Sequence, residues 1–229
     1  MKLIEFENSS ALDTALVIKV TELLIDTINK RGSASLVVSG GRTPLAFFHL
    51  LSQQVLDWSK VVVTLADERW VDADHGDSNE KLVRENLLIN EAHAAEFIPL
   101  KNAAIDAAEG ESQTESDIEL MGQFTIVILG MGDDGHTASL FPGAKTLALG
   151  LDMNSGRTAI AVTPTAAPHQ RMTLTLPRLL NSQHIIIHIS GASKQDVLKA
   201  AQAGEDITEL PIRAILNQQV APLLIFWAK

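Results

Sequence analysis

Short apolar runs alternate along the chain with longer stretches in which apolar residues recur at helical spacing. The short runs are rich in valine and isoleucine and are bounded by glycine or polar residues, which is typical of strands buried in a parallel sheet. The predicted strands are residues 2–6, 34–38, 61–66, 97–100, 124–129, 158–162, 184–190 and 222–227. Because helical stretches separate most of these runs, the pattern predicts an α/β fold with a mostly parallel sheet flanked by helices.

The stretches between the strands carry the signals of helix ends and helix faces. Leu12, Leu16 and later leucines recur at helical spacing after the capping oxygen of Asn8, so we expect a helix to about Lys30 with one face packed inward. The alternation of apolar residues with threonine over residues 171–176 instead predicts a half-exposed strand. Further helices are predicted from near Pro44, from Asp77 or Ser78 to about Asn90, within 103–120, from Pro177, after Lys194, and over 211–216.

Composition narrows the class of protein. A chain of 229 residues that is 46% hydrophobic and 20% charged can bury a large core, and it fits one domain over residues 1–229 better than two small ones. The formal net charge of −10 opposes nonspecific binding to nucleic acid or to an anionic membrane. The sequence contains no cysteine, so disulfides and thiolate chemistry are excluded. The first residues lack the apolar core of a signal peptide, and we expect a soluble cytoplasmic protein. The sequence leaves its oligomeric state open, with a monomer among the options.

The most informative stretch is QFTIVILGMGDDGHTASLFPG, residues 123–143. Its apolar first half is a predicted buried strand that stops at Gly130. Gly130, Gly132 and Gly135 permit backbone conformations and close approaches that a Cβ would forbid, so the chain can turn sharply and leave room at the carboxyl end of the strand. Open α/β sheets bind their ligands at that end of their strands.

Three titratable residues follow this strand end within four positions: Asp133, Asp134 and His136. Carboxylates beside an imidazole at a strand end suit proton transfer. Thr137 and Ser139 follow as candidate caps of a helix. A nucleophilic serine enzyme is disfavoured, because the Gly-x-Ser-x-Gly turn of such enzymes is missing.

A second glycine turn follows the predicted strand at 34–38 and leads into a helix. A helix start offers free backbone N–H groups and the positive end of the helix dipole, both of which favour a phosphate or carboxylate. An ordinary tight turn between strand and helix is the alternative. The candidate anion-binding residues of this turn are Gly40, Gly41, Arg42 and Thr43.

Charged residues also follow the strand at 61–66. Asp67, Glu68 and Arg69 stand at its carboxyl end, either as part of a site or as a self-paired surface cluster. Lys194 falls in the first turn of a predicted helix, where the helix dipole opposes a positive charge, and Arg171 stands at the entry of the threonine-rich strand. Both cations are candidates for binding an anionic ligand.

The loop VDADHGDSNE is rich in oxygen ligands but does not match a calcium loop. Such a loop needs glycine at its sixth position, whereas Gly76 is fifth when counted from Asp72. We therefore predict a solvated acidic loop without a metal ion. The acidic and histidine residues concerned are Asp72, Asp74, His75 and Asp77.

Gly130, Gly132 and Gly135 also match the dinucleotide fingerprint Gly-x-Gly-x-x-Gly, and Asp152 lies near the distance expected for a ribose contact. An oxidoreductase that binds a dinucleotide is therefore an alternative. It is weakened because two carboxylates, those of residues 133 and 134, would stand where the pyrophosphate binds and would repel it.

Five strings of the sequence together resemble the 6-phosphogluconolactonase family of the pentose phosphate pathway. They are SGGRTP, ADERWV with the later Ser78 and Asn79, ILGMGDDGHTASLFPG, RMTLTLP and SGASK, in the order of the family and spanning residues 39–194. The resemblance implies a single Rossmann-like α/β domain related to the glucosamine-6-phosphate deaminase and isomerase fold. The segment TAAPHQ, residues 165–170, departs from the proline-rich form of the family.

This resemblance implies hydrolysis of 6-phospho-D-glucono-1,5-lactone to 6-phospho-D-gluconate without a metal or organic cofactor. His136 corresponds to the general base of the family, and an imidazole with a solution pKa near 6.5 is sufficiently unprotonated at neutral pH for that task. Asp134 or Asp67 would orient the imidazole or bind sugar hydroxyls. The substrate-binding residues, chiefly for the phosphate, would be Gly40, Gly41, Arg42, Thr43, Arg69, Arg171 and Lys194.

Two further functions are compatible with the same motifs. A glucosamine-6-phosphate deaminase-like isomerase is disfavoured, because the deaminases carry a glutamate five positions after the histidine and here that position is Phe141. A noncatalytic sugar-phosphate sensor is disfavoured because His136 and both cationic anchors, Arg69 and Lys194, are present.

Overall fold

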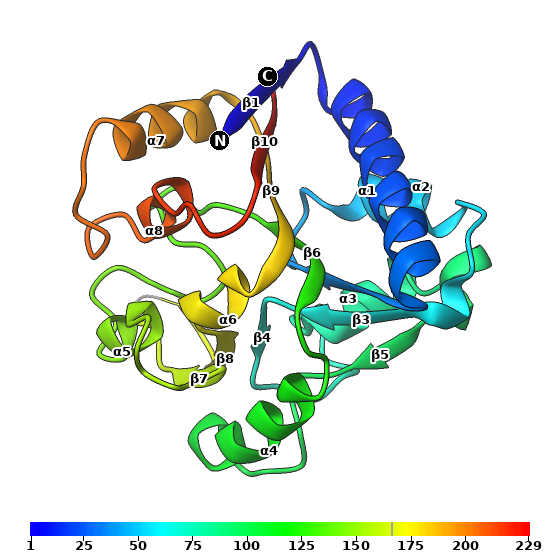
Figure 1. Cartoon of the computed structure of the whole chain (residues 1–229). Helices are drawn as coiled ribbons and strands as arrows, with labels where there is room; N and C mark the ends of the chain where they lie inside the picture. The colour runs from blue at the N-terminus through cyan, green and yellow to red at the C-terminus, as the bar shows by residue number, and fades with distance from the viewer. Residues whose placement is uncertain (166) are drawn as a thin grey trace.

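The computed structural model of the chain describes residues 1–165 and 167–229 and contains two sheets (Figure 1). The larger sheet is built from seven strands: β1 (Lys2–Phe6), β2 (Ala34–Val38), β3 (Val61–Leu65), β5 (Glu96–Ile98), β6 (Phe124–Leu129), β9 (Ser182–Ser190) and β10 (Leu223–Ala228). Their order is β1-β10-β9-β6-β2-β3-β5, and each neighbouring pair is parallel. The predicted α/β class with a mostly parallel sheet is confirmed.

A smaller antiparallel sheet lies beside the first. It consists of β4 (Asp67–Arg69), β8 (Arg171–Leu174) and β7 (Ala159–Val162), in that order. The strand predicted at 171–176 is present as β8, but the predicted half exposure is wrong, because all four of its residues are buried. Thr173 tolerates burial because its hydroxyl accepts a hydrogen bond from Ser139 N–H at 3.1 Å and donates one to Leu174 O.

Helices cover both faces of the parallel sheet (Figure 1). On one side lie α1 (Ser9–Arg31) and α2 (Leu45–Ser52), and on the other lie α6 (Leu176–Leu180), α7 (Ala192–Gln202) and α8 (Ile212–Leu216). The remaining helices are α3 (Asn79–Asn86), α4 (Ala107–Glu119) and α5 (Leu147–Leu151), with 3₁₀ turns at Trp58–Lys60 and Asn90–Ala94. Among the described residues, no helix combines the length and apolar character that crossing a bilayer requires.

The ends of the helices follow from local side chains. Asn8 Oδ1 accepts a hydrogen bond from Ala11 N–H at 3.0 Å and begins α1, as predicted. Gly32 ends α1 in the left-handed region, with φ of +85°. Ser78 caps α3 as predicted, but the helix ends at Asn86 rather than near Asn90, because a turn and a 3₁₀ segment replace its last part. Residue 166 of the TAAPHQ segment lies outside the described residues.

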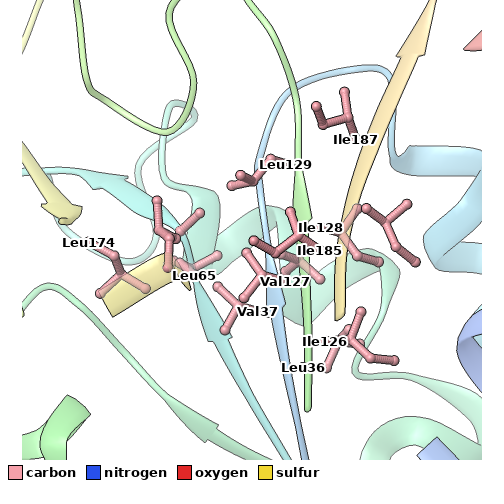
Figure 2. Packing of buried hydrophobic residues seen from close by; sticks show 14 of the residues in the cluster. Leu36, Val37, Leu65, Ile126, Val127, Ile128, Leu129, Leu174, Ile185 and Ile187 are labelled. Carbon is pink, nitrogen blue, oxygen red and sulfur yellow. The ribbon is translucent and has the colours of Figure 1, made fainter. Parts of the chain in front are cut away.

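The core lies along the central strands of the large sheet. All six residues of β6 and all five of β2 are buried, which is why these strands are almost wholly apolar. Their two polar residues, Ser35 and Thr125, hydrogen-bond to each other's backbone N–H groups. Figure 2 shows side chains of β2, β6 and β9 packed around the sheet, among them Leu36, Val127 and Ile185. Full burial of each such side chain stabilises the fold by about 1.5–3 kcal/mol. The strand ends are thereby held in fixed positions.

The direction of winding reverses between β2 and β6. From β2 the chain proceeds outward to β3 and β5, whereas from β6 it proceeds the other way to β9 and β10. Adjacent strands that diverge in this manner leave a crevice at their carboxyl ends, where ligands of open α/β sheets bind. The Ser39 hydroxyl, just after β2, bonds Ile128 O at 3.2 Å and joins the two strand ends.

Candidate active site

A cavity of about 250 Å³ opens at the carboxyl ends of β2, β6 and β9. Loops that follow these strands line it together with β4 and the first turn of α7. The residues predicted from the sequence that line it are His136, Asp67, Gly40, Gly41, Thr43, Arg69 and Lys194. The predicted Asp134, Arg42 and Arg171 are not among the lining residues. The sequence motifs therefore converge on one site, with these exceptions.

The glycine-rich loop after β6 folds back on itself to hold His136. Gly132 N–H donates a hydrogen bond to His136 O at 2.8 Å, and a Cβ at Gly132 would lie 2.2 Å from His136 Nδ1. Gly135 has a φ of +75°, and an added Cβ would lie 2.5 Å from Leu210 Cδ2. These glycines therefore make space for the imidazole and for the packing of the loop.

The helix predicted after Thr137 is absent, and the chain continues as turns until α5. The hydroxyl of Thr137 donates to Gly130 O at 2.8 Å, and that of Ser139 donates to Asp67 Oδ2 at 2.5 Å, so neither caps a helix. The dinucleotide fingerprint requires a helix that begins at its glycines. The structure contradicts that interpretation, and Asp152 lies exposed after α5.

His136 is oriented by the carboxylate two residues before it. Its Nδ1 lies 2.5 Å from Asp134 Oδ1, which also accepts the His136 backbone N–H at 3.1 Å. An ionised carboxylate only accepts hydrogen bonds, so Nδ1 carries the proton and Nε2 of the neutral ring keeps a free lone pair. The side chain of His136 is 29% exposed, and its ring centroid lies 4.4 Å from that of Phe141. This arrangement leaves the imidazole accessible to solvent at the cavity.

Asp67 occupies the buried wall of the cavity. Besides the bond from Ser139 to its carboxylate, its backbone oxygen accepts Asn79 Nδ2 at 2.8 Å. Asn79 also lines the cavity, and its Oδ1 is buried without a hydrogen-bond partner. A Cβ at Gly40 would lie 1.9 Å from this oxygen, so Gly40 is needed for the asparagine to fit. The sequence analysis used Asn79 only as part of a string and assigned it no place in the site.

Glu68 points away from the cavity and holds the start of α3. Its carboxylate accepts the backbone N–H groups of Arg69, Asn79 and Glu80 at 2.6–2.8 Å, and the Ser78 hydroxyl at 3.2 Å. Burial raises the pKa of Glu68, although the bonds from backbone N–H groups oppose that shift. The predicted self-paired surface cluster is therefore wrong for this residue, because it is buried.

Two cationic side chains line the cavity. Lys194 Nζ donates to Asp133 Oδ1 at 2.7 Å, and this contact lowers the pKa of Asp133. The acidic partner accounts for a lysine in the first turn of α7, where the dipole alone disfavours it. Arg69 Nη1 donates to Asp77 O at 2.5 Å, which fixes the guanidinium against the loop that precedes α3.

The two other predicted arginines are placed elsewhere. Arg171 is buried, and its Nη1 donates to the carbonyl groups of residues 168, 169 and 170. Burial lowers the pKa of Arg171, and the nearby charge of Arg69 adds to the effect. Arg42 is exposed on the glycine turn after β2. Neither guanidinium therefore lines the cavity of this structure.

A second histidine, His188, also lines the cavity. From the sequence it was predicted only as part of a buried strand. His188 in β9 is 5% exposed, and its Nε2 lies 3.3 Å from Asp13 Oδ1 of α1. Its ring packs edge-on against Phe47, with centroids 5.9 Å apart. The signal was an imidazole with isoleucine on both sides, which indicates a buried polar partner from another element.

Comparisons with known proteins agree with one another. The model of the family described as glucosamine-6-phosphate isomerases/6-phosphogluconolactonase matches residues 7–224. The 6-phosphogluconolactonase of Rhizobium meliloti (strain 1021) is 45% identical over 225 residues, covering 97% of each protein. The crystal structure of a 6-phosphogluconolactonase from Shewanella baltica OS155 is similar with a TM-score of 0.98 and 43% identity, covering 100% of this chain and 98% of that one. A monomeric glucosamine-6-phosphate deaminase shares the fold, with a TM-score of 0.79 at 19% identity over 98% of this chain and 97% of that one.

Proposed function

The chain belongs to the family of glucosamine-6-phosphate isomerases and 6-phosphogluconolactonases, and from that premise we propose that it hydrolyses 6-phospho-D-glucono-1,5-lactone to 6-phospho-D-gluconate. The reaction is the hydrolysis of a carboxylic ester within a ring, a step of the pentose phosphate pathway. The single observation that carries the mechanism is that His136 and Lys194 line the same cavity. A base and a cation at one cavity match a substrate with an electrophilic carbonyl at one end and a phosphate at the other.

His136 acts as the general base in this proposal. Because Nδ1 donates to Asp134, Nε2 is free to take a proton from a water molecule that attacks the lactone carbonyl. The same imidazole then returns the proton to the ring oxygen as the C–O bond breaks, so that the base is regenerated. Such proton transfer contributes typically about 10² to 10⁴ in rate. Asp134 is a positioning residue that selects the tautomer.

The phosphate binds at the cationic part of the cavity. Lys194 and Arg69 supply positive charge, and the turn at Gly40, Gly41 and Thr43 supplies backbone donors. Gly41 has a φ of +96°, a conformation that glycine adopts without strain. When the phosphate binds, the ammonium group of Lys194 donates to a phosphate oxygen and its hydrogen bond to Asp133 weakens. Asp67, hydrogen-bonded to Ser139, is available to accept a sugar hydroxyl.

The deaminase alternative lacks a carboxylate at the required place. Where the deaminases have a glutamate five residues after the histidine, this chain has Phe141, whose ring packs on His136. An aromatic ring neither donates nor accepts the protons needed to open a sugar ring, so lactone hydrolysis is favoured. We further propose that the enzyme acts in the cytoplasm and needs no metal or organic cofactor for this reaction.

The test is a pH-stat assay with freshly prepared 6-phospho-D-glucono-1,5-lactone, corrected for its spontaneous hydrolysis. We expect acid release well above the blank from the wild-type chain, and no ammonia release from glucosamine 6-phosphate. Acid release no faster than the blank would reject lactonase activity. Ammonia release instead would assign the chain to the deaminase branch of the family.

A further inference from the structure

Three potential metal ligands meet beside the cavity but outside its lining. His75 and Asp77 come from the loop between β4 and α3, and His169 comes from the segment just before β8. One ligand atom from each lies within 4.8 Å of the other two. We propose that His75, Asp77 and His169 form a binding site for a divalent transition metal such as Zn²⁺. This site is separate from the proposed hydrolytic machinery and does not depend on it.

The separations suit a shared ion. His169 Nε2 lies 3.1 Å from Asp77 Oδ2, and His75 Nδ1 lies 3.9 Å from the same oxygen. Bonds of about 2.0–2.2 Å in a tetrahedral zinc site place neighbouring ligand atoms roughly 3.3 Å apart. The side chains of His75, Asp77 and His169 are 47%, 55% and 29% exposed, so they have space to make the small movement that remains. A water molecule completes the coordination.

Two existing contacts must change when the ion binds. His169 Nε2 contacts Asp77 Oδ2 at 3.1 Å, so the His169 ring must carry its proton on Nδ1 for Nε2 to bind the ion. His75 Nδ1 accepts the Asp77 backbone N–H at 3.0 Å, so this nitrogen is occupied in the metal-free chain. The ring either gives up that bond or rotates to present Nε2. Because the loop is exposed, water replaces the lost partner of the N–H group.

The donor set selects the class of metal. Two imidazole nitrogens and one carboxylate oxygen suit Zn²⁺, Co²⁺, Ni²⁺ and Cu²⁺, whereas Ca²⁺ and Mg²⁺ prefer oxygen ligands throughout. The sequence analysis considered residues 72–77 alone and rejected a calcium loop. It did not connect this loop with His169, which is 92 positions from Asp77. The proposed site therefore needs the tertiary fold and differs from the loop that was rejected.

The backbone already holds the two segments together. Arg69 and Arg171 face each other in the pairing of β4 with β8, and Trp70 N–H donates to Gln170 O at 2.8 Å. The rings of His75 and His169 lie edge to face with centroids 5.4 Å apart. Since the ligands converge before an ion arrives, binding orders few additional groups and keeps more of its free energy.

The same segments hold the two arginines near the cavity. Arg69 donates to the carbonyl of Asp77, and Arg171 donates to the carbonyl of His169. An ion that links Asp77 to His169 therefore restrains both loops around Arg69. If the proposed function holds, the bound ion lowers the KM for the phosphorylated lactone and leaves kcat nearly unchanged. That consequence rests on the proposed function, whereas metal binding itself does not.

The experiment is a calorimetric titration of the full chain with Zn²⁺ after treatment with a chelator. We expect one ion per chain, and we expect Co²⁺ to produce visible absorption of a site with nitrogen ligands. His169→Gln and, separately, Asp77→Asn should weaken Zn²⁺ binding by at least about 100-fold, since even outer-shell partners of a metal are worth about 10–100-fold. Thermal unfolding confirms that each variant is folded.

Two histidine variants serve as controls. His93→Gln removes an exposed imidazole elsewhere in the chain, and His136→Gln removes one of the two imidazoles that line the cavity, so both should bind Zn²⁺ as the wild type does. Binding that persists unchanged in His169→Gln, or that disappears in His136→Gln, would overturn the proposal. So would the absence of Zn²⁺ uptake by the wild type. A lactone assay on the same metal-free sample reports the hydrolytic function independently.

Discussion

The charged groups at the mouth of the cavity are exposed to solvent, whereas those at and behind its wall are buried. At the mouth, His136 pairs with Asp134 and Lys194 pairs with Asp133, and both acidic partners are more than half exposed. In the wall, the buried carboxylate of Asp67 accepts the Ser139 hydroxyl, and behind it Glu68 is buried among hydrogen-bond donors. Water weakens the pairs at the mouth, so they exchange partners readily, whereas the buried contacts are costly to break.

This difference indicates a division of labour. Groups that must gain or lose a proton, or release a partner for a phosphate, lie where solvent and substrate reach them. Groups that set the backbone, such as Glu68 at the start of α3, lie where water does not compete. Changes at the mouth should therefore alter kinetics with little loss of stability, and a change at Glu68 should do the reverse.

The largest effect is expected from His136→Ala. Loss of the general base should reduce kcat for the lactone by about 10² to 10⁴, with KM within a few-fold of the wild type. Steady-state kinetics in the pH-stat measures both parameters. His93→Ala is the matched control, because His93 does not line the cavity. A kcat within tenfold of the wild type would remove His136 from the mechanism.

Glu68→Ala should have the next largest effect, which is a decrease in the free energy of unfolding. Truncation leaves several buried N–H groups without an acceptor, so the free energy of unfolding should fall by about 2–4 kcal/mol. Urea denaturation measures this change. Glu85→Ala, at an exposed position of α3, should change it by no more than about 0.5 kcal/mol. Equal effects of the two substitutions would contradict the role of Glu68 at the start of α3.

Lys194→Ala should act on binding. A hydrogen bond to a charged group contributes about 1.5–3 kcal/mol, so KM should rise roughly 10–100-fold while kcat changes less. Lys199→Ala, one turn further along α7, serves as the control for a lost positive charge. A fall in kcat with an unchanged KM would place Lys194 at the reacting carbonyl rather than at the phosphate.

Asp134→Asn should have a smaller kinetic effect. The amide can still contact the imidazole but no longer fixes which nitrogen carries the proton, so we expect kcat to fall about tenfold, or about 1.4 kcal/mol. The same assay measures it, together with the pH dependence of kcat. A variant with the rate and pH profile of the wild type would show that Asp134 does not position the base.

The smallest effect concerns the pH dependence of stability. Because burial raises the pKa of Glu68 above its ordinary value of 4.5, its contribution is fully present below that value and is lost as pH rises through the folded-state pKa. The stability of the wild type relative to Glu68→Gln should therefore decrease from about pH 4 toward neutral pH. Urea denaturation of both proteins at several pH values tests the sign. A difference that grows with pH would mean that the hydrogen bonds outweigh burial.

The strands and most helices could be predicted because their signals are local. Val127 and its neighbours in β6 form an apolar run that suits a strand buried on both faces, and Asn8 caps α1 through a residue three positions away. The errors arose where distant contacts decide. Ser139 is a residue type that commonly caps helices, yet its hydroxyl donates a hydrogen bond to Asp67, 72 positions earlier. Thr173 suggested an exposed face, yet it is buried in the small sheet.

The candidate site shows the same limit. Motifs that follow parallel strands converge because the carboxyl ends of those strands share one edge, so His136 and Lys194 could be expected to lie together. The direction of a long side chain is not fixed by such a rule, and Arg171 turns to backbone carbonyl groups instead of lining the cavity. Asn79 lines it through packing that no local pattern reveals, and the apolar run around His188 indicates a buried polar partner but not a place in the cavity.

The most direct test of the division between base and phosphate anchor is a crystal structure of the chain with 6-phospho-D-gluconate. The account predicts the C1 carboxylate within about 2.6–3.2 Å of His136 Nε2, the reach of proton transfer, and the phosphate in contact with Lys194. A product bound in the opposite sense, with its phosphate at His136, or bound outside the cavity, would contradict it.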